Sequence, residues 1–167
     1  LKSFACAVDD PVSGGRHKVL GAADLAIPPQ TSTIASHLPK SVGAAHAIGL
    51  MRRVPPREPA WDASAIAVAS FGDGSLNHST AQGALNAAGW AAVQGGAMPV
   101  LFVCEDNGIG ISVRSPDGWV RSVLSSRPGL AYFSADGCDM RDSRSAANAA
   151  AEFVRDRRRP AVLHLSL

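Results

Sequence analysis

Two short polar segments of the sequence combine residue types that bind hard metal ions and phosphates. The segments GDG at 72–74 and EDNG at 105–108 each directly follow an apolar run of strand length. Ligands of open α/β sheets bind at the carboxyl ends of the strands, so we expect Asp73 and Asn107 to converge there. A carboxylate, an amide oxygen and a nearby carbonyl suit Mg²⁺, which keeps phosphate oxygens or waters in its other positions. The pair therefore predicts a site for a diphosphate bridged by Mg²⁺ to the start of the next helix.

The same segments have two other interpretations, as simple turns or as nucleotide-binding motifs. Either segment alone is most often only a turn, and it is their occurrence at the ends of successive strands that indicates a site. The dinucleotide fingerprint fails, because Asn77 and Val113 stand where a third glycine is required. A Walker A lysine is also missing.

The elements that must position these segments alternate between strands and helices. The sequence predicts helices at 39–53, 77–94 and 143–158, and strands at 65–71, 99–104, 131–135 and 161–165. The runs at 65–71 and 99–104 are dominated by apolar residues, as strands buried on both faces are. This pattern predicts an α/β fold with a mostly parallel sheet and helices on both faces. We expect an irregular N-terminal segment over 1–38 and an α/β binding domain, incomplete, over 39–167.

Composition excludes several classes of protein. The chain has 167 residues and a formal net charge of +2, which disfavours nucleic acid as a partner. Its apolar runs are far shorter than the ~20 residues of a membrane span, so we expect no membrane. Three cysteines without CxxC spacing argue for a reducing, cytoplasmic location. Because the chain opens on Leu1, we expect it to be a piece of a longer protein.

Longer stretches of the sequence resemble a known family. They are SHLPKSVGAA at 36–45, FGDGSLN at 71–77, LFVCEDNGIGIS at 101–112 and DGCD at 136–139. These stretches resemble the α subunit of the decarboxylating component of 2-oxo acid dehydrogenase complexes, in the pyruvate and branched-chain class. The resemblance implies the thiamine diphosphate-binding fold. It also implies an oxidoreductase that oxidatively decarboxylates a 2-oxo acid and transfers the acyl group to a lipoyl carrier.

The resemblance carries over to individual residues. It implies that Asp73, the side chain of Asn107 and the carbonyl of Ile109 bind Mg²⁺. The cofactor would be bordered by five further residues: Gly72, Gly74 and Ser75 at the diphosphate, and Ser32 and Ile34 at the aminopyrimidine ring. No catalytic residue is assigned, and His37 and His78 are the candidates. One departure from the family is Asp106, which stands where the family has the first of two asparagines.

The resemblance also implies partners. The glutamate that activates the cofactor belongs to a β-type subunit or fused β-type domain, and a lipoyl acyltransferase component receives the product. We therefore expect a homo- or hetero-oligomer, and a chain that is inactive alone. Two alternatives stay open: a transketolase-like or non-oxidative thiamine diphosphate enzyme, and a catalytically silent scaffold fragment. The sequence does not identify the 2-oxo acid.

Overall fold

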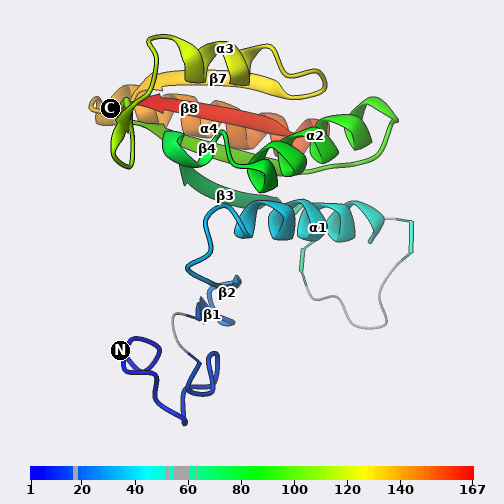
Figure 1. The fold of residues 1–167 in the computed structure, drawn as a ribbon. Coiled ribbons are helices and arrows are strands. Elements are labelled where there is room, and N and C mark those ends of the chain that lie inside the picture. Colours follow the sequence, from blue (N-terminus) through cyan, green and yellow to red (C-terminus); the bar gives the residue numbers. More distant parts are fainter. Residues whose placement is uncertain (17–18, 52, 55–60, 63) are drawn as a thin grey trace.

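A four-stranded parallel sheet forms the centre of the protein. The computed structural model describes residues 1–16, 19–51, 53–54, 61–62 and 64–167. The strands lie in the order β3-β4-β8-β7, and each pairs in parallel with its neighbour. Their bounds are Ala67–Gly72 (β3), Val100–Asp106 (β4), Ala161–Ser166 (β8) and Ala131–Asp136 (β7). The strand β8, which follows the other three in sequence, thus lies inside the sheet, between β4 and β7 (Figure 1).

Helices cover both faces of this sheet. In the described part of the chain the α-helices are α1 (His37–Leu50), α2 (Ser79–Val93), α3 (Trp119–Ser125) and α4 (Met140–Arg157). Successive strand residues point to opposite faces. Phe102 accordingly packs in one buried cluster with residues of α1, α2 and α3, and Leu101 in another with residues of α4. The α/β fold predicted from the sequence is confirmed. The apolar run of β4 fits a strand largely buried on both faces, whereas β3 at the edge of the sheet alternates between exposed and buried residues.

Two helices, α2 and α4, begin at residues other than the predicted ones, and capping interactions explain where they begin. The helix predicted from residue 143 begins at Met140, because the Asp139 carboxylate accepts hydrogen bonds from the N–H groups of Arg141 and Asp142. The helix predicted from residue 77 begins at Ser79, where the side chain of His78 accepts from the N–H of Thr80.

The first helix is also displaced from its predicted bounds. The prediction was 39–53, whereas α1 runs from His37 to Leu50, and Pro39 lies in its first turn, where no N–H is needed. Arg53 therefore lies beyond the helix, and Arg52 lies outside the described residues.

Short elements that the sequence did not predict complete the fold. Within 1–38, β1 (Leu20–Ala22) pairs antiparallel with β2 (Ile27–Gln30), so this segment is not irregular throughout. The two prolines of β2 argue against a strand in the sequence, but a strand at the edge of a sheet tolerates proline. The segment after β4 folds into the hairpin β5 (Ile109–Gly110) and β6 (Val113–Arg114), and a 3₁₀ turn, η1 (Asp73–Ser75), follows β3.

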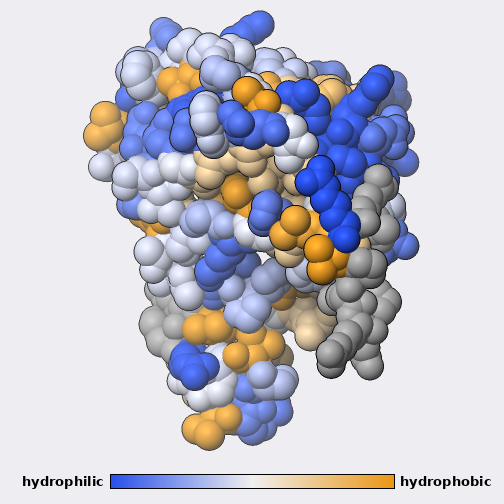
Figure 2. Space-filling view, turned by 90° about the vertical axis from the view of Figure 1, so that its right-hand side faces the viewer, coloured by the Kyte–Doolittle hydropathy of each residue, from blue (hydrophilic) through white to orange (hydrophobic). Residues whose placement is uncertain are grey.

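The N-terminal segment stands apart from the core. Both buried clusters are built from Ala35 and later residues. Figure 2 shows the lower part of the molecule as a narrower extension with hydrophobic side chains on its surface, and Leu1, Phe4, Val8 and Leu25 are exposed. Within the part of the chain that the structure describes, no helix has the length and apolar character needed to cross a membrane. The division into 1–38 and 39–167 stays a prediction.

Candidate metal and cofactor site

A pocket of about 260 Å³ opens at the carboxyl ends of β3 and β4. The residues that line it are Gly72, Asp73, Gly74, Ser75, Glu105, Asn107, Ile109, Ile111 and Leu167. The two polar segments of the sequence therefore meet, as their positions after successive parallel strands predicted. Six of the residues that the resemblance implies for metal and diphosphate lie in this one place: Gly72, Asp73, Gly74, Ser75, Asn107 and Ile109.

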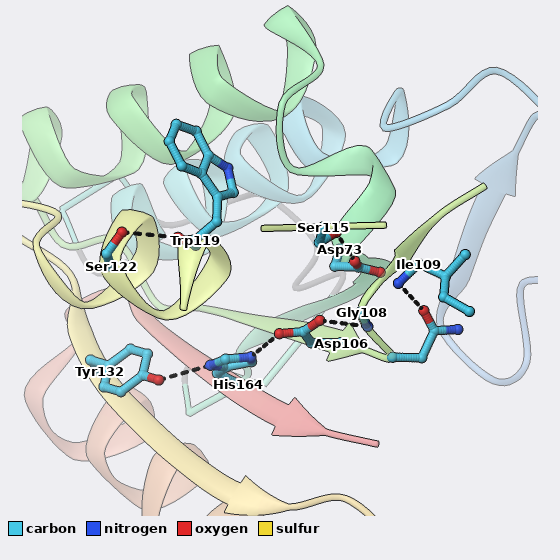
Figure 3. Close-up of polar contacts among 10 residues, drawn as sticks. Asp73, Asp106, Gly108, Ile109, Ser115, Trp119, Ser122, Tyr132 and His164 are labelled. Carbon is cyan, nitrogen blue, oxygen red and sulfur yellow. Dashed lines mark hydrogen bonds and ion pairs between the residues drawn. The ribbon is translucent and has the colours of Figure 1, made fainter. Parts of the chain in front are cut away.

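Asp73 is the buried charge of the pocket. Its side chain sits in the 3₁₀ turn directly after β3, and the residue is only 4% exposed. Its Oδ2 accepts a hydrogen bond from the Ser115 hydroxyl at 2.5 Å (Figure 3). Among the described residues no lysine, arginine or histidine forms an ion pair with it. A buried carboxylate with one hydroxyl partner is costly to bury without a cation, so the pocket is suited to a positive ion.

The second side of the pocket is a tight loop between β4 and β5. The side-chain oxygen of Asn107 accepts from the N–H of Ile109 at 3.0 Å, and Gly108 adopts a left-handed φ of 71°. The carbonyl of Gly108 then accepts from the N–H of Ser115 at 2.9 Å. This bond places the Ser115 hydroxyl beside Asp73. No pattern in the sequence points to Ser115, because this residue lies 42 residues from its partner Asp73.

The two sides touch through their main chains. A Cβ added at Gly74 would lie 3.0 Å from the Cα of Gly110 and 3.5 Å from the nitrogen of Ile111. A side chain at position 74 would thus push η1 away from β5. The glycine permits the close approach that brings Asp73 and the Ile109 segment together.

Negative charge dominates the field of the site. The pKa of the Cys104 thiol is raised to about 12, chiefly by burial and further by the carboxylates of Asp106, Asp73 and Glu105. Among the described residues that line the pocket there is no lysine or arginine. A diphosphate entering alone would meet like charge, whereas a divalent cation would be attracted and would neutralise both groups.

The donor set fits Mg²⁺. It offers a carboxylate, an amide oxygen and a backbone carbonyl, all hard oxygen ligands. In the described part of the chain no three His, Cys, Asp or Glu residues gather into a metal-binding group. A site built of imidazole or thiolate, which would favour zinc or copper, is therefore not seen there.

The other residues implied by the resemblance lie outside this pocket. Ser32 and Ile34 precede α1, and Ile34 is 47% exposed. The Nε2 of His37 is bonded to the carbonyl of Ser70 at 2.6 Å, and His37 lines a separate pocket of about 500 Å³ beside β3. His78 is engaged as the cap of α2. The structure thus does not bring the two candidate histidines to the metal site.

The sequence of the chain is similar to those of known proteins. The family model described as "Dehydrogenase E1 component" matches residues 2–166. The chain is 32% identical over 136 residues to the mitochondrial 2-oxoisovalerate dehydrogenase subunit alpha 2 of Arabidopsis thaliana. That match covers 80% of this chain and 26% of the relative, so the chain spans about a quarter of the relative's length.

Solved structures share the fold. Transketolase from Leishmania mexicana superposes with a TM-score of 0.63 and 20% identity, over 81% of this chain and 20% of that one. A candidate thiamin diphosphate-dependent enzyme isolated from Mycobacterium smegmatis gives a TM-score of 0.55 and 23% identity, over 84% of this chain and 23% of that one. The match of the family model over nearly the whole chain shows that the protein belongs to the dehydrogenase E1 component family.

Proposed function

We propose that this chain forms the Mg²⁺- and diphosphate-binding part of an α-type E1 component that uses thiamine diphosphate to decarboxylate a 2-oxo acid oxidatively. The observation that carries the proposal is the buried Asp73 carboxylate, which has no cationic partner among the described residues and shares a pocket with Asn107 and Ile109. Membership of the family supports the choice of cofactor. The relative's name further supports a branched-chain 2-oxo acid as the class of substrate.

In this proposal, the residues of this chain bind and orient the metal ion and the cofactor. Asp73, the side chain of Asn107 and the carbonyl of Ile109 hold Mg²⁺, while the N–H groups of Gly74 and Ser75, at the start of the 3₁₀ turn, face the diphosphate. For Asn107 to bind metal, its side-chain oxygen must share or release the bond from the N–H of Ile109. The cofactor supplies the nucleophilic carbon that the decarboxylation needs.

The rest of the reaction requires partners. The described residues at the pocket include no glutamate that is buried and aimed into it, since Glu105 is exposed. We propose that a β-type subunit or domain provides the activating glutamate, that the assembly is an oligomer, and that a lipoyl acyltransferase component accepts the acyl group. A transketolase-like reaction is less favoured, because the family model that matches is that of the dehydrogenases.

Calorimetric titration of the full-length protein tests the metal site. Thiamine diphosphate is titrated with Mg²⁺ present and again with a chelator, into the wild type, Asp73→Asn and the control Asp156→Asn. Asp156 is an exposed residue of α4, on the other face of the sheet. We expect Mg²⁺-dependent binding that Asp73→Asn weakens by at least about 100-fold, because even loss of a group that supports a ligand costs ~10–100-fold.

Two results would contradict the proposal. Undiminished binding by Asp73→Asn would show that the cofactor lies elsewhere, and absence of binding by the full-length wild type would favour the scaffold alternative. Turnover of branched 2-oxo acids with and without a lipoyl acceptor then tests the reaction. Acyl transfer that depends on the lipoyl group is expected, and turnover without it would indicate a non-oxidative enzyme.

A further inference from the structure

We propose that Tyr132, His164 and Asp106 form a hydrogen-bond chain that holds the 107–109 loop in its metal-binding conformation, with His164 as the positioning residue. None of the three is assigned a contact with substrate or cofactor. The effect on metal binding rests on the proposed function, whereas the effect on the loop stands without it.

The three residues come from three adjacent strands. His164 lies on β8 with 4% of its surface exposed, and β8 is paired with β4 on one side and β7 on the other. Its Nε2 lies 2.8 Å from Oδ2 of Asp106 at the end of β4. Its Nδ1 lies 2.8 Å from the hydroxyl oxygen of Tyr132 on β7 (Figure 3). A polar chain therefore crosses the sheet and ends one residue before Asn107.

The chemistry of the groups sets the direction of the bond to Asp106. A carboxylate only accepts, so Nε2 of His164 donates to Oδ2 of Asp106. Nδ1 of His164 shares the second hydrogen bond with the hydroxyl of Tyr132. Each ring nitrogen thus has a partner, which is the condition under which a buried polar group stabilises one conformation.

Asp106 transmits this restraint to the loop. While Oδ2 is bound to His164, Oδ1 accepts from the N–H of Gly108 at 3.0 Å. The next turn repeats the pattern, since Oδ1 of Asn107 accepts from the N–H of Ile109. The backbone carbonyl of Asp106 also accepts from the N–H of Leu167, at 2.7 Å, which ties the same residue to the end of β8.

Loss of His164 should therefore loosen a defined set of bonds. Without the imidazole, the Asp106 side chain is free to rotate, and the Gly108 N–H loses an acceptor held in place. The orientation of the Asn107 side chain and of the Ile109 carbonyl depends on the same short segment. A metal site needs its ligands oriented by such supporting groups, whose loss typically costs ~10–100-fold in metal affinity.

The test compares His164 variants with a control of general stability in the full-length protein. His164→Phe fills the space without hydrogen bonds, and His164→Gln retains a donor toward Asp106. Tyr132→Phe removes only the far end of the chain, and serves if His164→Phe does not fold. Val154→Ala is the control, because Val154 is buried among residues of α4 in the other core cluster.

Two readouts are measured well below the melting temperature of every variant. The first is amide hydrogen exchange at Gly108 and Ile109 without metal, and the second is Mg²⁺ affinity in the presence of thiamine diphosphate. We expect His164→Phe to speed exchange at both amides and to weaken Mg²⁺ binding by about 10–100-fold. His164→Gln should retain most of the protection of these amides and most of the Mg²⁺ affinity. Val154→Ala should lower the stability of the protein without changing the exchange rates or the Mg²⁺ affinity.

A purely structural role gives a different pattern. If His164→Phe lowers stability but leaves exchange at Gly108 and Ile109 as in Val154→Ala, the proposal is overturned. If the wild type binds no Mg²⁺, the proposed function fails, and the exchange rates alone decide whether His164 holds the loop.

Discussion

The close contact between η1 and β5 makes a quantitative prediction about two glycines on either side of Asp73. Alanine at position 74 would place its Cβ 3.0 Å from the Cα of Gly110, and the nearest atoms are all backbone. Alanine at position 72 would meet only the Glu105 carbonyl oxygen, at an ordinary 3.9 Å. Neither glycine has a positive φ, so a difference between the two variants reports on space and not on backbone strain.

The magnitude follows from two terms. Both substitutions reduce the entropy of the unfolded chain, which stabilises by about 0.4–1 kcal/mol where the native backbone accepts alanine. Only Gly74→Ala adds overpacking, which costs about 1–3 kcal/mol. Gly74→Ala should therefore be less stable than Gly72→Ala by about 1–3 kcal/mol. For a chain of this length that is a difference of about 2–12 °C in melting temperature.

Urea and thermal unfolding of the two variants provide the assay, followed by Mg²⁺ titration. Gly74→Ala is expected to bind Mg²⁺ more weakly as well, because relief of the contact moves Asp73 away from the Ile109 segment. Equal stability of Gly74→Ala and Gly72→Ala would refute the reasoning, since it would mean that β5 yields freely and does not set the width of the site.

Three further predictions concern the thiols and the start of α4. Cys104 is buried and should resist a thiol reagent at pH 8 in the native protein, whereas exposed Cys138 should react, as mass spectrometry of the labelled sites would show. Because the folded pKa of Cys104 is raised from 9.0 to about 12, its contribution to stability is complete below pH 9 and is lost as the pH rises toward 12, by at most about 1.4 kcal/mol per pH unit. Unfolding at pH 8 and pH 10 should show this loss in the wild type and a smaller one in Cys104→Ala. Asp139→Ala should cost about 1 kcal/mol in urea unfolding, and no loss would mean that the two N–H groups of α4 find another acceptor.

The sequence was most informative where apolar runs and polar segments alternate. The strands β3 and β4 were predicted within two residues of their observed bounds, because both are apolar runs of strand length. β4 is largely buried on both faces as expected, whereas β3, at the edge of the sheet, alternates between exposed and buried residues. The convergence of Asp73 and Asn107 followed from the rule for parallel strands, and the structure confirms it. Their roles as metal ligands stay predictions.

The contacts that could not be predicted from the sequence depend on strand register and on side-chain rotation. His164 was not linked to Asp106, since the two lie 58 residues apart and meet only because β8 is inserted beside β4. Ser115 reaches Asp73 through a hairpin of two-residue strands, which have no periodicity to detect. The helix cap at Asp139 could have been recognised in the sequence, because an aspartate there precedes a helical stretch. The predicted helix began at residue 143 and did not include this cap.

The position of β8 has a consequence for how the protein is made. A chain leaves the ribosome from its N-terminus, at roughly 5–20 residues per second. Asp106 is therefore synthesised roughly 3–12 s before His164, which follows it by 58 residues. Until β8 enters the gap between β4 and β7, the loop that follows Asp106 has no partner across the sheet. The newborn protein should consequently acquire its affinity for metal only after β8 has entered the sheet, and not while the two polar segments are emerging.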